Sequence, residues 1–198
     1  MSHFELAQIN IARFVQPKEH SSNLPFMDAL DAVNAEAEAS PGFLWRLVGD
    51  GNNATDVEAV PGDSRLIVNM SVGSDMASLS AFAYRNKPHV AVFRRKHEWF
   101  EPMAVSLALW WVPAGHPPAA AEGIARLEKL ARLGSTHEAF TFKSPFPPPV
   151  GHCQGQRKSY PVLRWPQTST HSARGPFRLR QAQPERGLGL SSAICRLH

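Results

Sequence analysis

Residues 4–14 read FELAQINIARF, and this stretch decides the predicted fold. Apolar and β-branched side chains alternate in it with polar ones, which is the pattern of a β-strand. One side of this strand carries Phe4, Leu6, Gln8 and Asn10 and is therefore half polar. The stretch predicts a first strand whose sheet has one face of mixed character, called here the mixed face.

A helix is predicted next, over residues 21–39, because its apolar residues recur at spacings of four, three and four on one helical side. These residues are Phe26, Leu30, Val33 and Ala37. Either Ser22 or Asn23 can cap the first turn. The helix should stop at Ser40, which begins a Ser-Pro-Gly turn.

The remaining elements follow from the same patterns of period and turn residues. Strands are predicted at 43–48, 64–72, 104–113 and 138–142, and helices at 74–84 and 117–134, with residues 84–102 continuing the second helix. The order is β-α-β-β-α-β, then α-β. It predicts an α+β protein with the split β-α-β of ferredoxin-like folds, one antiparallel sheet and helices on a single face.

The mixed face needs a cover, because it is too apolar for water and too polar for a dry core. Asn69 lies within an apolar strand, while Trp45, Trp110 and Trp111 mark two other strands. A second copy of the chain closing over this face is the economical solution. We therefore expect a homodimer with a shared cavity for a small hydrophobic or aromatic ligand.

The basic charge of the chain is concentrated at its end. Residues 151–198 hold eight basic residues and one acidic residue, whereas residues 1–150 hold thirteen and sixteen. The body is therefore mildly acidic despite a sequence pI of about 9.4. Arg94, Arg95 and Lys96 cannot point the same way on one helix, so no nucleic-acid partner is expected.

The positions of the cysteines and the hydropathy of the sequence indicate where in the cell the protein is expected. Cys153 and Cys195, the two cysteines, lie outside residues 1–150, which therefore have no disulfide framework or zinc–thiolate site. The first residues lack the features of a signal peptide, and the longest apolar run is too short to cross a membrane. A soluble cytoplasmic protein is expected.

Several stretches, in one order over nearly all of residues 1–150, resemble the bacterial family catalogued as domain of unknown function 3291. They are FELAQINIARF, PGFLWRL, VNMSV, YRNKPHVAVFRRKHEWFEP, LWWVPAGHPP and AFTFKSPFPPP. The resemblance implies a dimeric α+β barrel. Relatives in that superfamily include cofactor-free monooxygenases of aromatic polyketides, haem-degrading enzymes and haem-binding carotenoid oxygenases, while the family itself has no established activity.

The chain departs from the family pattern at a few places. Gly73 stands where the family commonly has Trp, residues 86–88 replace a serine-containing turn, and Gly123 replaces a helix-favouring residue. Residues 151–198 lie outside the resemblance and look like a translated intergenic repeat. Their Pro, Gly, Gln, Ser and Arg content predicts a disordered basic extension of a domain that spans residues 1–150.

The stretch at 84–102 has two interpretations. It is either an amphipathic helix with solvated cations whose stems cover aromatic rings, or the edge of the cavity. In the second interpretation His89 and Arg94 lie at the cavity mouth and bind an anionic or carbonyl-bearing ligand. His89 and His97 are too far apart on one helix to share a metal ion, and no metal site is expected.

Two functions from different classes remain open. In a cofactor-free oxygenase, Asn10, Trp45 and Asn69 would bind an aromatic substrate with Arg94 and Trp99, while His89 would act as base or charge stabiliser. The alternative is a binding module without catalysis for a hydrophobic ligand or haem, with His89 or another histidine as the iron ligand.

Overall fold

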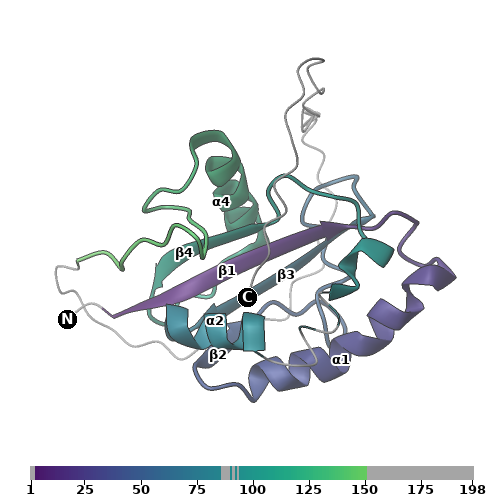
Figure 1. Cartoon of the computed structure of the whole chain (residues 1–198), viewed down its shortest axis with the longest axis horizontal. Helices are drawn as coiled ribbons and strands as arrows, with labels where there is room; N and C mark the ends of the chain where they lie inside the picture. The colour runs from purple at the N-terminus through teal and green to yellow at the C-terminus, as the bar shows by residue number, and fades with distance from the viewer. Residues whose placement is uncertain (1–2, 86–89, 91, 93, 151–198) are drawn as a thin grey trace, which may run out of the picture. The chain divides into compact units, whose positions relative to one another are not determined.

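The computed structural model describes residues 3–85, 90, 92 and 94–150 (Figure 1). The elements are β1 (Phe4–Arg13), α1 (Leu24–Glu38), β2 (Phe43–Arg46), β3 (Leu66–Gly73), α2 (Met76–Arg85), β4 (Leu107–Pro113) and α4 (Ala120–Leu133), with 3-10 turns at Ser21–Asn23 and Lys96–Glu98. The predicted extension at 151–198 lies outside the described residues.

The four strands form one antiparallel sheet in the order β2-β3-β1-β4. The order along the chain is β-α-β-β-α-β with a further helix, which confirms the predicted α+β, ferredoxin-like split β-α-β. Because β1 and β3 are the two central strands, side chains on them lie in the middle of the sheet.

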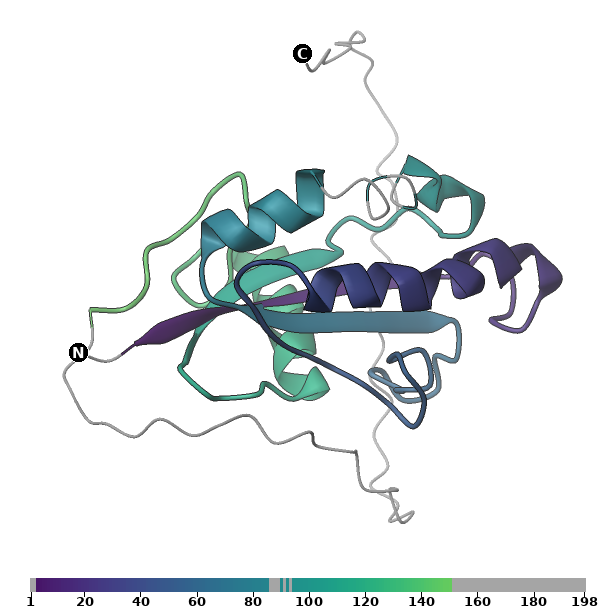
Figure 2. The same cartoon turned by 90° about the horizontal axis from the view of Figure 1, so that it is seen from below.

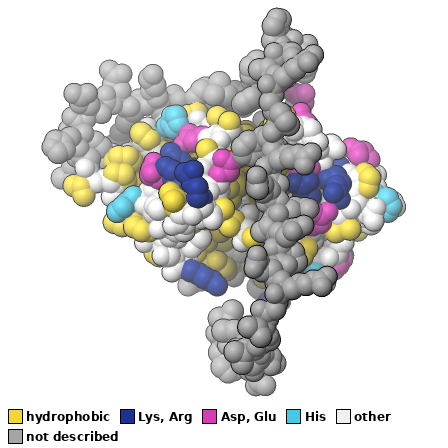
Figure 3. Space-filling view, turned by 90° about the horizontal axis from the view of Figure 1, so that it is seen from above, with side chains coloured by type: hydrophobic (Ala, Val, Ile, Leu, Met, Phe, Trp, Pro, Cys, Tyr) yellow, Lys and Arg dark blue, Asp and Glu magenta, His cyan; other side chains and the backbone are white. Residues whose placement is uncertain are grey.

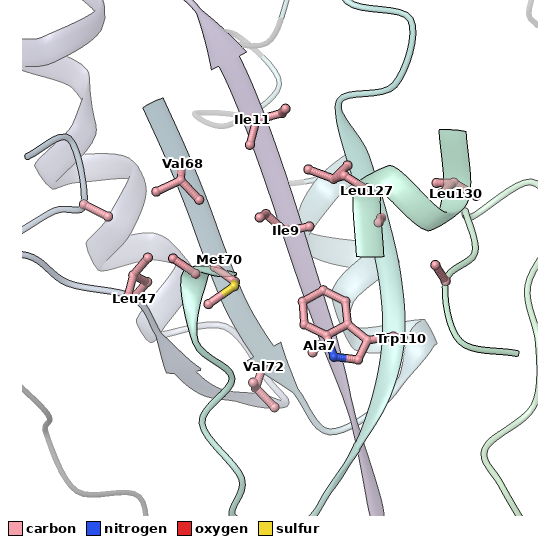
Figure 4. Close-up of a cluster of buried hydrophobic side chains, with 14 of the residues drawn as sticks. Ala7, Ile9, Ile11, Leu47, Val68, Met70, Val72, Trp110, Leu127 and Leu130 are labelled. Atoms are coloured by element: carbon pink, nitrogen blue, oxygen red, sulfur yellow. The ribbon is translucent and has the colours of Figure 1, made fainter. Parts of the chain in front are cut away.

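The centre of one face of the sheet is apolar and packs against α4 (Figure 4). Its strand residues alternate with those of the mixed face, since successive side chains point to opposite sides. They are Ala7, Ile9, Ile11, Val68, Met70, Val72, Ala108, Trp110 and Val112. From α4, Leu127 and Leu130 complete this core.

Gly123 explains how closely α4 approaches the sheet. It is buried, and a β-carbon built there would stand 2.6 Å from Ile9 Cδ1 and 2.9 Å from Met70 Sδ. Contacts this short are not tolerated between real atoms. Glycine at this position therefore lets α4 pack closely on β1 and β3, where a larger residue would have to displace the ends of the Ile9 and Met70 side chains.

The mixed face carries α1 and α2, so the helices occupy both sides of the sheet and not one. Leu79 of α2 packs with Leu6, and Phe26 of α1 packs with Ile67. In Figure 2, α2 and α4 lie on opposite sides of the strands. The expectation that the helices leave the mixed face free was wrong, because apolar residues at both ends of that face bind α1 and α2.

The helix predicted over 84–102 is observed in part, because the described residues up to Arg94 are helical and those after it are not. Helix α2 ends at Arg85, and Lys96–Glu98 form only a 3-10 turn. Phe100 then pairs with Phe14 in an isolated bridge. Trp99, which precedes it, is buried against α1, and this burial of an aromatic pair turns the chain back toward the sheet.

The predicted strand at 138–142 is reduced to a single bridging pair. Leu109 and Phe140 exchange backbone hydrogen bonds of 2.8 and 2.9 Å, and no longer ladder forms there. Phe140 is fully buried beside Leu6. Side-chain burial, more than strand pairing, therefore holds this segment at the edge of the mixed face.

The ends of helices α1, α2 and α4 are formed in different ways. Asn23 precedes α1 but makes no cap bond, because its side-chain nitrogen donates to the carbonyls of Pro17 and Lys18. Asp75 does cap α2, since its Oδ1 accepts from the backbone nitrogen of Ser78 at 2.8 Å. Gly134 ends α4 with a φ of 70°.

The long β2–β3 connection is joined to α1 by side-chain bonds. Arg46 donates to Glu38 Oε1 at 2.6 Å and to Asn52 Oδ1 at 3.2 Å. Asn52 donates in turn to Asp31 Oδ1 at 3.1 Å. The side chain of Arg46 is only 9% exposed, whereas that of its partner Glu38 is 48% exposed, so the pair lies at the edge of the solvent.

Candidate functional site

A row of polar side chains crosses the two central strands on the mixed face. In the β1–β3 register Asn10 lies opposite Asn69, and Gln8 lies opposite Ser71. Directly opposite residues of an antiparallel pair project from the same face. Gln8 also donates from Nε2 to Asn69 Oδ1 at 3.2 Å. We call these four residues the polar strip.

Apolar clusters flank the polar strip on both sides, and each contains residues from one of the two helices. Their buried members are Leu6, Leu79, Leu109 and Phe140 on one side and Phe14, Phe26, Ile67 and Trp99 on the other. Phe26 lies edge-on to Phe14 and Phe100, with centroids 5.7 and 4.9 Å away. The strip is therefore a hydrogen-bonding floor between two apolar, aromatic walls.

The two helices do not cover the strip. Asn69 is exposed although β3 is a central strand and although this face carries α1 and α2. Gln8, Asn10 and Ser71 are partly exposed. Within the described part of the chain, the side chain of Asn10 has no hydrogen-bond partner. The strip can therefore offer unused amide donors and acceptors to a ligand.

The structure brings together only some of the residues predicted for the site. Asn10 and Asn69 are neighbours, whereas Trp45 lies opposite Val72 and packs into the apolar core on the other face of the sheet. Trp99 is 3% exposed within an aromatic cluster, and Arg94 is exposed. The proposed base or iron ligand, His89, lies outside the described residues.

The cationic run near residue 95 is partly neutralised. Arg95 forms two bonds to Glu98, of 2.9 and 2.8 Å, and its guanidinium lies over the Trp99 ring at 4.9 Å. The bond to Glu98 raises the pKa of Arg95 and lowers that of Glu98. The charged group of Arg95 therefore lies over an aromatic ring, while the covering of rings by cationic stems stays a prediction.

The basic residues are dispersed over the surface. On the face that Figure 3 shows, Lys and Arg side chains stand in small separate groups with acidic side chains nearby. Arg13 is paired with Asp63, and Arg65 is paired with Glu101. Each of these cations therefore has an acidic partner.

A second polar cluster lies at the end of β4, on the side of α4. Glu122 accepts from Trp110 Nε1 at 2.8 Å and from Arg126 at 3.4 Å, and His116 Nε2 lies 3.4 Å from its other oxygen. Trp110 is fully buried, so Glu122 supplies the acceptor that its indole nitrogen needs. This cluster is internally paired and supports the packing of α4.

Within residues 3–85, 90, 92 and 94–150, no three His, Cys, Asp or Glu residues are placed to hold a metal ion. In the same part of the chain no helix combines the length and apolar character needed to span a bilayer. The structure describes a single chain, so the homodimer stays a prediction, as does haem.

The sequence pattern of the family described as "Domain of unknown function (DUF3291)" matches residues 5–156, which include all the strands and helices above apart from the first residue of β1. The chain belongs to this family. No functionally curated protein matches this DUF3291 member. The family assignment agrees with the resemblance seen in the sequence and carries no activity with it.

Three solved structures are similar to this DUF3291 chain at low identity. PA3566 from Pseudomonas aeruginosa is 13% identical, with 57% of this chain and 96% of that chain covered and a TM-score of 0.40. A Nitrosomonas europaea protein described as "Putative antibiotic biosynthesis monooxygenase" is 12% identical, with 60% and 97% covered and a TM-score of 0.40. NE2512, a protein of unknown function from the same organism, is 14% identical, with 60% and 99% covered and a TM-score of 0.38.

Proposed function

We propose that the polar strip binds a flat, mainly apolar small molecule that carries carbonyl or hydroxyl groups. The observation behind this proposal is the exposure of Asn69 in the middle of a central strand, between two apolar clusters. Small-molecule sites are generally apolar, with a few polar groups that fix orientation. Gln8, Asn10 and Asn69 provide such groups.

The reaction proposed for this site is cofactor-free oxygenation of an aromatic substrate. Amide N–H donors directed at a substrate oxygen stabilise the enolate that forms when the ring system loses a proton. Anthrone is a suitable probe, because its ring methylene reacts with O2 to give anthraquinone and one molecule of water. The methylene supplies both hydrogens and the electrons, and His89 is the proposed base.

The binding half of the proposal is tested with alizarin, a coloured anthraquinone in which a hydroxyl lies beside a ring carbonyl. Loss of one or two hydrogen bonds in Asn69→Ala or Asn10→Ala should weaken alizarin binding about tenfold, as followed by absorbance titration. Gln16→Ala is the matched control, because Gln16 is an exposed amide in the loop after β1. Unchanged affinity in both strip variants contradicts the assignment.

The catalytic half is tested separately with an oxygen electrode. Wild-type protein should accelerate O2 consumption and anthraquinone formation from anthrone, and Asn69→Ala should slow both. Alizarin binding without any acceleration by the wild-type protein would favour the alternative, a binding module for a hydrophobic ligand.

A further inference from the structure

Asn34 is a buried amide inside α1 that has no visible structural purpose. The residue is 7% exposed, which is unusual for an asparagine. Within the described residues its side chain has no hydrogen-bond partner, although buried polar side chains nearly always have one. An unpaired buried amide lowers stability, so we expect Asn34 to have a partner outside the described residues.

The helical geometry directs Asn34 at the sheet. At 100° per residue, Asn34 lies about 20° from Met27 and about 40° from Leu30 around the axis of α1. Met27 and Leu30 both pack against the cluster that contains Ile67 of β3. Asn34 therefore shares the side of α1 that faces the mixed face.

Its level along the sheet is fixed by its neighbours one turn away on either side. Leu30 packs with the Ile67 cluster, while Glu38 bonds to Arg46, which lies opposite Ser71. Helix α1 runs in the same direction as β3 (Figure 1). Four residues of a helix advance about 6 Å along its axis, and two residues of a strand advance about 6.6 Å. Every fourth residue of α1 therefore lies level with about every second residue of β3. Asn69 is the β3 residue that lies between Ile67 and Ser71 on this face of the sheet. Asn34, midway between Leu30 and Glu38, should therefore lie level with Asn69 of the polar strip.

We infer that Asn34 is a ligand-binding residue of the polar strip and selects ligands in which a carbonyl oxygen lies beside an O–H or N–H group. This inference rests on the proposed function. A carboxamide presents an acceptor and a donor side by side and no charge. An uncharged ligand edge with the complementary pair satisfies both groups of Asn34, whereas an aromatic ketone without a neighbouring donor satisfies only its nitrogen.

The test is Asn34→Leu, because leucine has the same branching and number of heavy atoms as asparagine. Two quantities are measured, the Tm of the ligand-free protein and the affinities for alizarin and for anthraquinone, which has the same rings without hydroxyls. The Tm should rise by about 2–4 °C as an unpaired amide is removed. Alizarin binding should weaken tenfold or more, while anthraquinone binding changes less than threefold.

Asp28→Leu is the control for helix propensity, since Asp28 is an exposed residue of the same helix. If Asn34→Leu does not fold, Asn34→Ala is used in its place, because it removes the amide without adding volume. The same Tm and affinities are measured for this variant. Its alizarin affinity should fall tenfold, and its Tm should stay within about 2 °C of wild type.

Two outcomes overturn the inference. A loss of several degrees of Tm in the Ala variant means that Asn34 has a structural partner. Unchanged alizarin affinity in a folded Asn34 variant means that this amide does not bind the ligand. In the second case, weaker alizarin binding by Asn69→Ala still supports the proposed function. Unchanged alizarin binding by both the Asn10 and the Asn69 variants contradicts ligand binding by the polar strip.

Discussion

Gly123 of α4 lies so close to Ile9 of β1 that a β-carbon at position 123 would stand 2.6 Å from Ile9 Cδ1. The glycine costs helix propensity, by about 1 kcal/mol relative to alanine. In return, the absence of a side chain at position 123 lets the backbone of α4 approach the apolar face of the sheet.

We therefore expect Gly123→Ala to destabilise the protein despite the gain in helix propensity. Overpacking a core by one methyl group costs about 1–3 kcal/mol, so the net loss should be measurable in chemical denaturation. Ala125→Gly, at an exposed position of the same helix, measures the propensity term alone and should cost about 1 kcal/mol. A more stable Gly123→Ala variant would show that α4 can move outward freely.

Glu122→Leu should destabilise the protein by about 1–3 kcal/mol, because it leaves the buried Trp110 indole nitrogen without its acceptor. Glu122→Gln keeps an oxygen at this place and should lose less. Glu128→Leu, exposed on the same helix, should change the free energy of unfolding by no more than about 0.5 kcal/mol. Equal effects of the two leucine variants would contradict a role for the Trp110 bond.

The cap of α2 gives the protein a pH-dependent contribution to stability. Hydrogen bonds from the Ser78 backbone and the Ser74 hydroxyl lower the pKa of Asp75 below its ordinary value of 3.8. A lowered folded pKa means that the contribution is complete above that value and is lost as the pH falls through the folded pKa.

The Tm of Asp75→Ala should therefore lie below that of wild type near neutral pH, by the equivalent of about 1 kcal/mol. This difference should shrink as the pH is lowered below 3.8. Asp75→Asn retains a capping oxygen without the charge and should flatten this part of the profile. A difference that stays constant down to the lowest pH would exclude the carboxylate as its cause.

Trp99→Ala should be among the most destabilising single changes, at about 3–5 kcal/mol, because the ring is buried among Phe26, Phe14 and Phe100. The expected signature is a lower Tm in the absence of any ligand. Leu133→Ala, which removes an exposed side chain, should have little effect. If the Trp99→Ala variant has the wild-type Tm but binds alizarin weakly, Trp99 contributes to ligand binding and not to stability.

The sequence was sufficient to predict the sheet because its strands have clear periods. FELAQINIAR alternates, and the apolar residues around Leu127 and Leu130 recur at helical spacing. The pattern could not determine which face the helices cover, because both faces of β1 contain apolar residues. Only the packing of Leu6 and Ile67 with α2 and α1 settles this.

The site was predicted in part for the same reason. Asn10 and Asn69 were detectable as polar residues within apolar strands, and the register places them together. Trp45 was assigned to the wrong face because an irregularity between Phe43 and Trp45 shifts the pairing of β2. The burial of Asn34 was not predicted, since a polar residue within a helix normally marks the exposed side. Its spacing of seven from Met27 was the available signal.

Arg46 and Asn52 donate hydrogen bonds to Glu38 and Asp31, and these bonds tie α1 to the strand and loop beside it. These bonds oppose sliding of α1 along the sheet and so favour a fixed spacing between the helix and the strands. A binding surface of fixed length on this face would select ligands by their size as well as by their hydrogen-bonding groups.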